Sequence, residues 1–175
     1  MLKRPDNKKV EKVINVGTGA VKVGRAGATL RSTAIGSCIV IAAYDSSRRI
    51  GALAHVMLPG RAPERTVEKR TRYAADAIDE LIDRIARTGA KRCDIEVCLV
   101  GGGNVLKEGD DTICRDNIES TTQLLEKKHI PVRAAVLGGT KRRGIFLDVE
   151  RGKIFYTEGE GKKKLLWEPA KEYKE

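Results

Sequence analysis

Aromatic residues and long apolar runs are scarce in this chain of 175 residues. Phe, Trp and Tyr make up only 4% of the residues, so a core must be built mainly from Ile, Val, Leu and Ala. No apolar run approaches the roughly 20 residues that cross a bilayer. The first residues, Met1–Pro5, lack the pattern of a signal peptide. We therefore expect a cytoplasmic protein without membrane insertion.

Metal-ligand and cofactor motifs are also missing from the sequence. The four cysteines form no Cys-x-x-Cys pair, and the two histidines have no zinc-ligand spacing. Gly101–Gly103 follows an apolar run, but no helix pattern and no Gly-Lys-Ser/Thr come directly after it. The sequence therefore predicts no metal and no cofactor, and it excludes P-loop and Rossmann sites. In the cytoplasm the thiols are expected to stay reduced.

Charge is plentiful and unbalanced, with a formal net charge of +10. Basic clusters lie at Lys141–Arg143 and Lys162–Lys164. Such an excess suits an acidic partner surface or nucleic acid. Stacking aromatics, which single-strand binders use, do not interleave with these clusters. We expect no nucleic-acid binding; the charges either solvate the surface or face an acidic partner.

The chain is long enough for one domain with a proper core. Residues 1–11 are polar and basic and are expected to form a flexible N-terminal tail. Residues 12–158 are the expected domain. Residues 159–175 form a charged C-terminal tail that contains Trp167, whose apolar neighbours dock either on a partner or on the domain itself.

Two helices and seven or eight strands are expected. Apolar residues at helical spacing predict one helix over about 66–88. A capping-box pattern at 116–119 predicts the start of a second helix over about 117–129. So many strands with only two helices favour an α+β fold, with the helices over one face.

One predicted hairpin brings a cysteine and a histidine together. Ala34–Ile41 and Ile50–Pro59 predict two strands joined by a polar turn. If the turn is residues 45–48, Cys38 lies directly opposite His55, and facing residues in an antiparallel pair share a face. A loop of two or six residues keeps that shared face, whereas an odd loop separates the two side chains.

A thiol beside an imidazole can carry nucleophilic chemistry, because the histidine accepts the thiol proton. Such a thiol is expected to be more ionised at neutral pH than a free one. Each residue also has an ordinary structural interpretation. Cys38 in an apolar run fits a small buried side chain, and His55 fits a hydrogen-bonded core residue.

The segments Gly36-Ser37-Cys38 and Gly51–Pro59 resemble the CheD family of chemoreceptor glutamine deamidases. The resemblance runs from about residue 12 to about residue 158. Its other matching positions are Tyr73, Gly101–Gly103, Asn117, Gly138–Gly139 and Arg143. It implies a single-domain layered α/β/β sandwich of mostly antiparallel strands, with two main helices on one face.

The resemblance also implies an activity and its residues. The activity is that of a protein-glutamine glutaminase, a cysteine hydrolase that releases ammonia. Cys38 falls on the family's catalytic cysteine and His55 on its histidine. Ser32 stands where the family has a catalytic threonine, and Thr33 is an alternative third member. Backbone N–H groups of the Gly36-Ser37 pair are implied to bind the substrate.

Two partners are implied as well. One is the set of cytoplasmic helices of chemotaxis receptors, which are acidic coiled coils, and the other is a CheC-type phosphatase of the response regulator. An alternative function is therefore that of a binding partner and regulator of that phosphatase. A further alternative is a thiol hydrolase that cleaves peptides.

Overall fold

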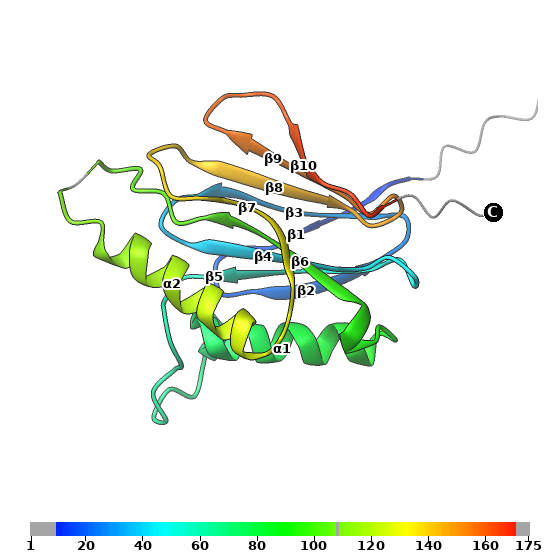
Figure 1. Cartoon of the computed structure of the whole chain (residues 1–175), viewed down its shortest axis with the longest axis horizontal. Helices are drawn as coiled ribbons and strands as arrows, with labels where there is room; N and C mark the ends of the chain where they lie inside the picture. The colour runs from blue at the N-terminus through cyan, green and yellow to red at the C-terminus, as the bar shows by residue number, and fades with distance from the viewer. Residues whose placement is uncertain (1–9, 108, 171–175) are drawn as a thin grey trace, which may run out of the picture.

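Two five-stranded sheets are stacked, and two helices cover the outer face of one of them (Figure 1). The computed structural model describes residues 10–107 and 109–170. The first sheet contains, in spatial order, β1 (Lys12–Asn15), β3 (Ala28–Ile35), β8 (Arg143–Asp148), β9 (Lys153–Glu158) and β10 (Lys164–Trp167). The second contains β2 (Val21–Arg25), β5 (Ile50–Val56), β4 (Ile39–Asp45), β6 (Ile95–Gly101) and β7 (Val132–Leu137).

The helices α1 (Ala74–Arg87) and α2 (Thr112–Lys127) pack on the second sheet, and short 3₁₀ turns lie at Arg70–Arg72 and Arg92–Asp94. The apolar stripe of α1 forms one core with every second residue of β4 and β5. The remaining residues of these strands form a second core between the two sheets. Because both of their faces are covered, β4 and β5 are buried at every position.

This architecture confirms the α+β layered sandwich that the sequence predicts. Of the eight pairings between strands in the described part of the chain, only β1–β3 and β6–β7 are parallel. The predicted helix boundaries were less accurate. The first helix begins at Ala74, and only a 3₁₀ turn precedes it.

The expected capping box at 116–119 was wrong. Helix α2 begins at Thr112, after Asp111 at its N-cap, so Asp116 and Asn117 lie inside the helix rather than at its start. The side chain of Asn117 is fully buried. Its position within α2 bears directly on the site described below.

The C-terminal segment differs from the expected charged tail, because residues 164–167 pair with β9 as strand β10. Leu166 and Trp167 pack against the core between the sheets, so the apolar neighbours of Trp167 dock on the domain itself. Most of the expected N-terminal tail, residues 1–9, lies outside the described residues.

Candidate functional site

The predicted nucleophile lies where the chain crosses from one sheet to the other. Strand β3 belongs to the first sheet and β4 to the second, and Gly36–Cys38 is the bend between them. The pairing of β3 with β8 shifts register after Ser32, and Ala34 takes a left-handed φ of 57°. This irregularity turns the chain out of the first sheet at the end of the sandwich drawn on the left of Figure 1.

Cys38 and His55 share a face, but they are not directly opposite. The hairpin pairs Asp45 with Ile50 and Val40 with His55, so the predicted register was wrong by one step on each strand. In that register Cys38 is the diagonal neighbour of His55, two residues before the residue that faces it. Such neighbours remain within reach of longer side chains. The loop is still even in length, so both side chains point toward the space between the sheets.

The structure settles which hydroxyl lies at the histidine. Ser32 is buried, and its Oγ lies 2.8 Å from Nδ1 of His55. Thr33 is exposed on the opposite face of β3. The Ser32 hydroxyl donates to the Val16 carbonyl at 2.6 Å. Its one hydrogen is thereby used, so Nδ1–H of His55 donates to Ser32 and Nε2 carries the free lone pair.

The pKa shifts of Cys38 and His55 both disfavour a thiolate–imidazolium ion pair. Burial lowers the pKa of His55 below its usual 6.5, and the contact with the Val16 carbonyl offsets this only in part. Burial also raises the pKa of the Cys38 thiol above its usual 9.0, against a lowering contact from its own backbone N–H. Both directions favour a neutral thiol beside a neutral imidazole. They are opposite to the expected, more ionised thiol, and alkylation of Cys38 near neutral pH distinguishes the two.

A glycine turn after β6 holds the nucleophile bend from the other side. The N–H of Gly102 donates to the carbonyl of Cys38 at 2.8 Å, and the N–H of Gly103 donates to the carbonyl of Gly36 at 2.9 Å. A Cβ at Gly101 would lie 2.0 Å from the Cys38 carbonyl oxygen, and φ there is 135°. Only glycine permits this approach.

Arg143 is a structural part of the same end of the sandwich. Its Nη1 donates to the carbonyls of Gly138, at 2.6 Å, and Gly101, at 3.3 Å. Its Nε lies 3.5 Å from Glu158 Oε1, and the side chain is 7% exposed. Of the predicted basic cluster Lys141–Arg143, only the first two residues are therefore exposed to a partner.

Asn117 is one of the positions that match the CheD resemblance, but the sequence assigned it no role at the site. Its Nδ2 donates to the carbonyl of Ser37 at 2.9 Å and to that of Met57 at 3.0 Å. These carbonyls lie one residue before Cys38 and two residues after His55. The available signal was helical spacing, because Asn117, Thr121 and Leu125 recur at intervals of four and are all buried in α2.

A pocket of about 280 Å³ opens beside the nucleophile bend. Gly36 and Ser37, the predicted substrate-binding pair, form part of its wall together with Arg142. Leu106 and Ile113 also line it, and their side chains are 72% and 41% exposed. The lining therefore combines exposed apolar side chains with one cation, Arg142, and one carboxylate, Asp110.

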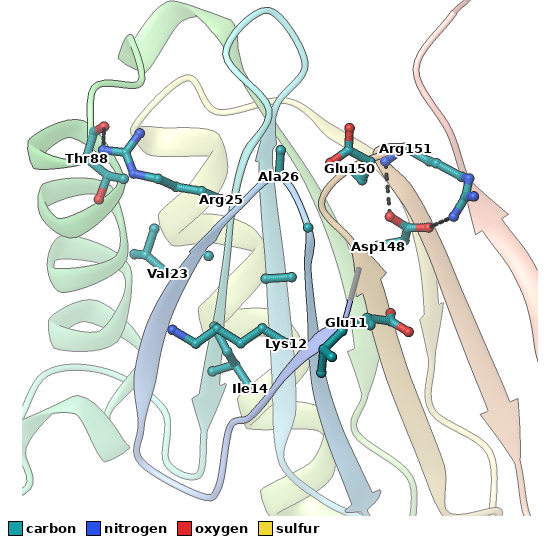
Figure 2. A pocket seen from close by; sticks show the side chains of 14 residues that line it. Glu11, Lys12, Ile14, Val23, Arg25, Ala26, Thr88, Asp148, Glu150 and Arg151 are labelled. Carbon is teal, nitrogen blue, oxygen red and sulfur yellow. Dashed lines mark hydrogen bonds and ion pairs between the residues drawn. The ribbon is translucent and has the colours of Figure 1, made fainter. Parts of the chain in front are cut away.

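A larger pocket, of about 780 Å³, lies at the opposite end of the sandwich (Figure 2). Its walls include Arg25, which pairs with Ile50 at the far end of β5, and the turn after β8. Several of the charged side chains there have partners within the protein, as when Arg151 contacts Asp148 at 3.0 Å. Neither Cys38 nor His55 reaches this pocket.

Across residues 10–107 and 109–170, no three His, Cys, Asp or Glu side chains gather in a way that could hold a metal ion. Within the same ranges no helix has the length and apolar character to cross a membrane.

The fold is an α/β/β sandwich. Its candidate site combines a cysteine, a histidine and a serine near the bend where the chain crosses from the first sheet to the second. Comparison with known proteins identifies the family. Residues 57–158 match the family model described as CheD chemotactic sensory transduction. The chain belongs to the CheD family.

Curated relatives extend the similarity over most of the chain. A protein of Chlorobium luteolum named probable chemoreceptor glutamine deamidase CheD is 38% identical over 86% of this chain and 75% of its own. Proteins of the same name from Methanosarcina barkeri and Methanococcus maripaludis are 34% and 32% identical. They cover 79% and 84% of this chain, and 92% and 96% of their own length.

Proposed function

We propose that this protein hydrolyses the side-chain amide of glutamine residues on chemoreceptors, giving glutamate and ammonia. Cys38 is the nucleophile, His55 the general base and acid, and Ser32 the residue that orients the imidazole. Membership of the CheD family and the names of its relatives support the reaction and the substrate. The arrangement of the three side chains supports the roles.

The first step forms a bond between Cys38 Sγ and the amide carbon of the substrate. His55 Nε2 takes the thiol proton as the sulfur attacks, because Nδ1–H is held by Ser32. The carbonyl oxygen gains negative charge in the tetrahedral intermediate. The backbone N–H of Cys38, next to the attacking sulfur, is the donor that we propose for this charge. His55 then returns the proton to the leaving nitrogen, the C–N bond breaks, and ammonia departs.

The second step releases glutamate. The same Nε2 takes a proton from a water molecule, whose oxygen attacks the thioester carbon. The C–S bond breaks and the sulfur recovers the proton from the imidazolium. Over both steps one amide and one water become one carboxylic acid and one ammonia, and the protein is unchanged. A glutamyl methyl ester has an equivalent acyl carbon and enters the same sequence.

A neutral resting pair makes proton transfer part of the attack rather than a step before it. Burial opposes both the thiolate and the imidazolium, as the two pKa directions indicate. Negative charge then develops only during the attack, when the carbonyl oxygen of the substrate can accept it. The single observation that carries the proposal is the Ser32–His55 contact, because it leaves the basic nitrogen free on a histidine that shares a face with Cys38.

The face around the nucleophile suits an amphipathic helix. Leu106 and Ile113 offer exposed apolar contacts beside Gly36 and Ser37, and Arg142 adds a positive charge. A receptor helix lying across this pocket can place an apolar residue in it and present a neighbouring glutamine to Cys38.

A CheC-type phosphatase is the second proposed partner, and the cytoplasm is the proposed location. Binding to such a phosphatase is separable from catalysis, because Cys38→Ala removes only a sulfur atom at a partly exposed position. Retained binding by a Cys38→Ala protein that has lost deamidation would show two functions on one chain.

The test is incubation of the purified protein with the cytoplasmic fragment of a chemoreceptor. We expect ammonia release and conversion of specific glutamines to glutamates, read by peptide mass spectrometry. New peptide termini instead of ammonia would identify a peptide-cleaving thiol hydrolase. Cys93→Ala is the matched control, since that cysteine is exposed and distant in sequence from the bend. Cys38→Ala should lose the activity and Cys93→Ala should keep it.

A further inference from the structure

Asn117 holds the peptide bond that precedes the nucleophile. It projects from α2 and is fully buried, and its Nδ2 donates to Ser37 O at 2.9 Å and to Met57 O at 3.0 Å. With both hydrogens engaged, the amide group has a fixed orientation. The hydrogen bond to the Met57 carbonyl therefore keeps the second amide hydrogen of Asn117 directed at the Ser37 carbonyl.

The Ser37 carbonyl and the Cys38 N–H belong to one planar unit. No peptide bond in the described residues is cis, and in a trans peptide the C=O and the N–H point in opposite directions. Fixing the carbonyl toward α2 thus fixes the N–H away from it. This N–H belongs to the nucleophile itself. The oxyanion develops on the substrate oxygen, on the carbon that becomes bonded to the Cys38 sulfur, so the direction of the N–H decides whether it can reach that charge.

The environment of Asn117 argues against a role in packing alone. Its Oδ1 is buried without a hydrogen-bond partner, and an unpaired buried carbonyl lowers stability. Thr121 lies one turn later on the same side of α2, and its Oγ1 is likewise buried and unpartnered. Because its Oγ1 has no hydrogen-bond partner, Thr121 does not hold the nucleophile bend, and it offers a matched control.

We propose that Asn117 is a positioning residue that orients the Ser37–Cys38 peptide so that the Cys38 N–H stabilises the oxyanion of the deamidation reaction. This inference rests on the proposed function. It assigns to α2 a part in the chemistry, although no side chain of α2 acts on the substrate in the mechanism above.

The experiment compares two reactions of the same sulfur. Amide hydrolysis passes through a tetrahedral oxyanion, whereas alkylation by iodoacetamide is a displacement at a saturated carbon and forms none. Loss of an oxyanion donor costs about 100- to 1,000-fold in kcat. Because Asn117→Ala misorients the donor rather than deleting it, we expect a fall in kcat of about tenfold or more. The alkylation rate of Cys38 should stay close to that of the unmodified protein.

Thr121→Ala should leave both reactions unchanged, whatever its effect on melting temperature. If Asn117→Ala does not fold, Asn117→Ser supplies the same comparison with a polar side chain of shorter reach. Equal losses in deamidation and alkylation would mean that Asn117 only supports the fold, and no loss in either would remove its role. If the unmodified protein releases no ammonia, the proposed function fails and this inference with it. Ammonia release without the selective loss overturns the inference alone.

Discussion

Ser32→Ala removes the hydroxyl that lies between His55 Nδ1 and the Val16 carbonyl. The lost contact is one hydrogen bond between neutral groups, whose net value is about 0.5–1.5 kcal/mol. At about 1.4 kcal/mol for each factor of ten, kcat/KM should fall about 2- to 12-fold. The effect is limited because Nδ1–H can then donate to the Val16 carbonyl, which already contacts the imidazole.

Steady-state ammonia release from a receptor fragment measures this effect. Ser32→Thr keeps a hydroxyl and should retain most of the rate, whereas Thr33→Ala alters an exposed side chain and should have none of the effect. A slow Thr33→Ala protein beside a normal Ser32→Ala protein would refute the assignment. A loss as complete as that of Cys38→Ala would also refute the reasoning, because orientation of a neutral imidazole does not account for so large a change.

Three further predictions concern the turn, the titration and the charge. Gly101→Ala should abolish ammonia release, because its Cβ would lie 2.0 Å from the Cys38 carbonyl oxygen; Gly27→Ala, at a φ of 88° with open space around it, is the control that should remain active. Activity should be level at neutral pH. It should fall only below the usual histidine value of 6.5, where His55 protonates, and above the usual thiol value of 9.0, where Cys38 ionises; a fast-alkylating Cys38 thiolate at pH 6.5 would contradict this order. Added salt should lower kcat/KM for the receptor fragment but not for a small neutral glutamine peptide, since the Debye length shrinks from about 10 Å at 0.1 M to about 3 Å at 1 M. Neutralising the exposed Lys141 and Arg142 should weaken the salt dependence, and a rate that salt leaves unchanged would exclude electrostatic steering.

The sequence correctly predicted that Cys38 and His55 share a face, although the predicted strand register was wrong. Side chains alternate along a strand, so a shift of one step on each strand preserves the face and changes only the distance. The two helices and the layered fold followed from periodicity and from the count of strands. The family resemblance supplied the placement of Ser32.

The remaining features depend on contacts between distant segments. The tautomer of His55 is set by the Ser32 hydroxyl and the Val16 carbonyl, and the pKa directions are set by burial between the two sheets. A capping-box pattern placed Asn117 at a helix start, whereas α2 begins five residues earlier and buries it. Arg143 belongs to a basic cluster that looks exposed in the sequence, yet its side chain is buried and donates to the carbonyls of Gly101 and Gly138.

The most direct test of the central claim is to trap the acyl-enzyme. The protein is mixed with a glutamine-bearing receptor fragment, quenched in acid during turnover, digested and examined by mass spectrometry. We expect a thioester that joins the substrate glutamyl group to Cys38, and hydroxylamine should remove it. An acyl group on any other residue, or ammonia release from a folded Cys38→Ala protein, would contradict the account.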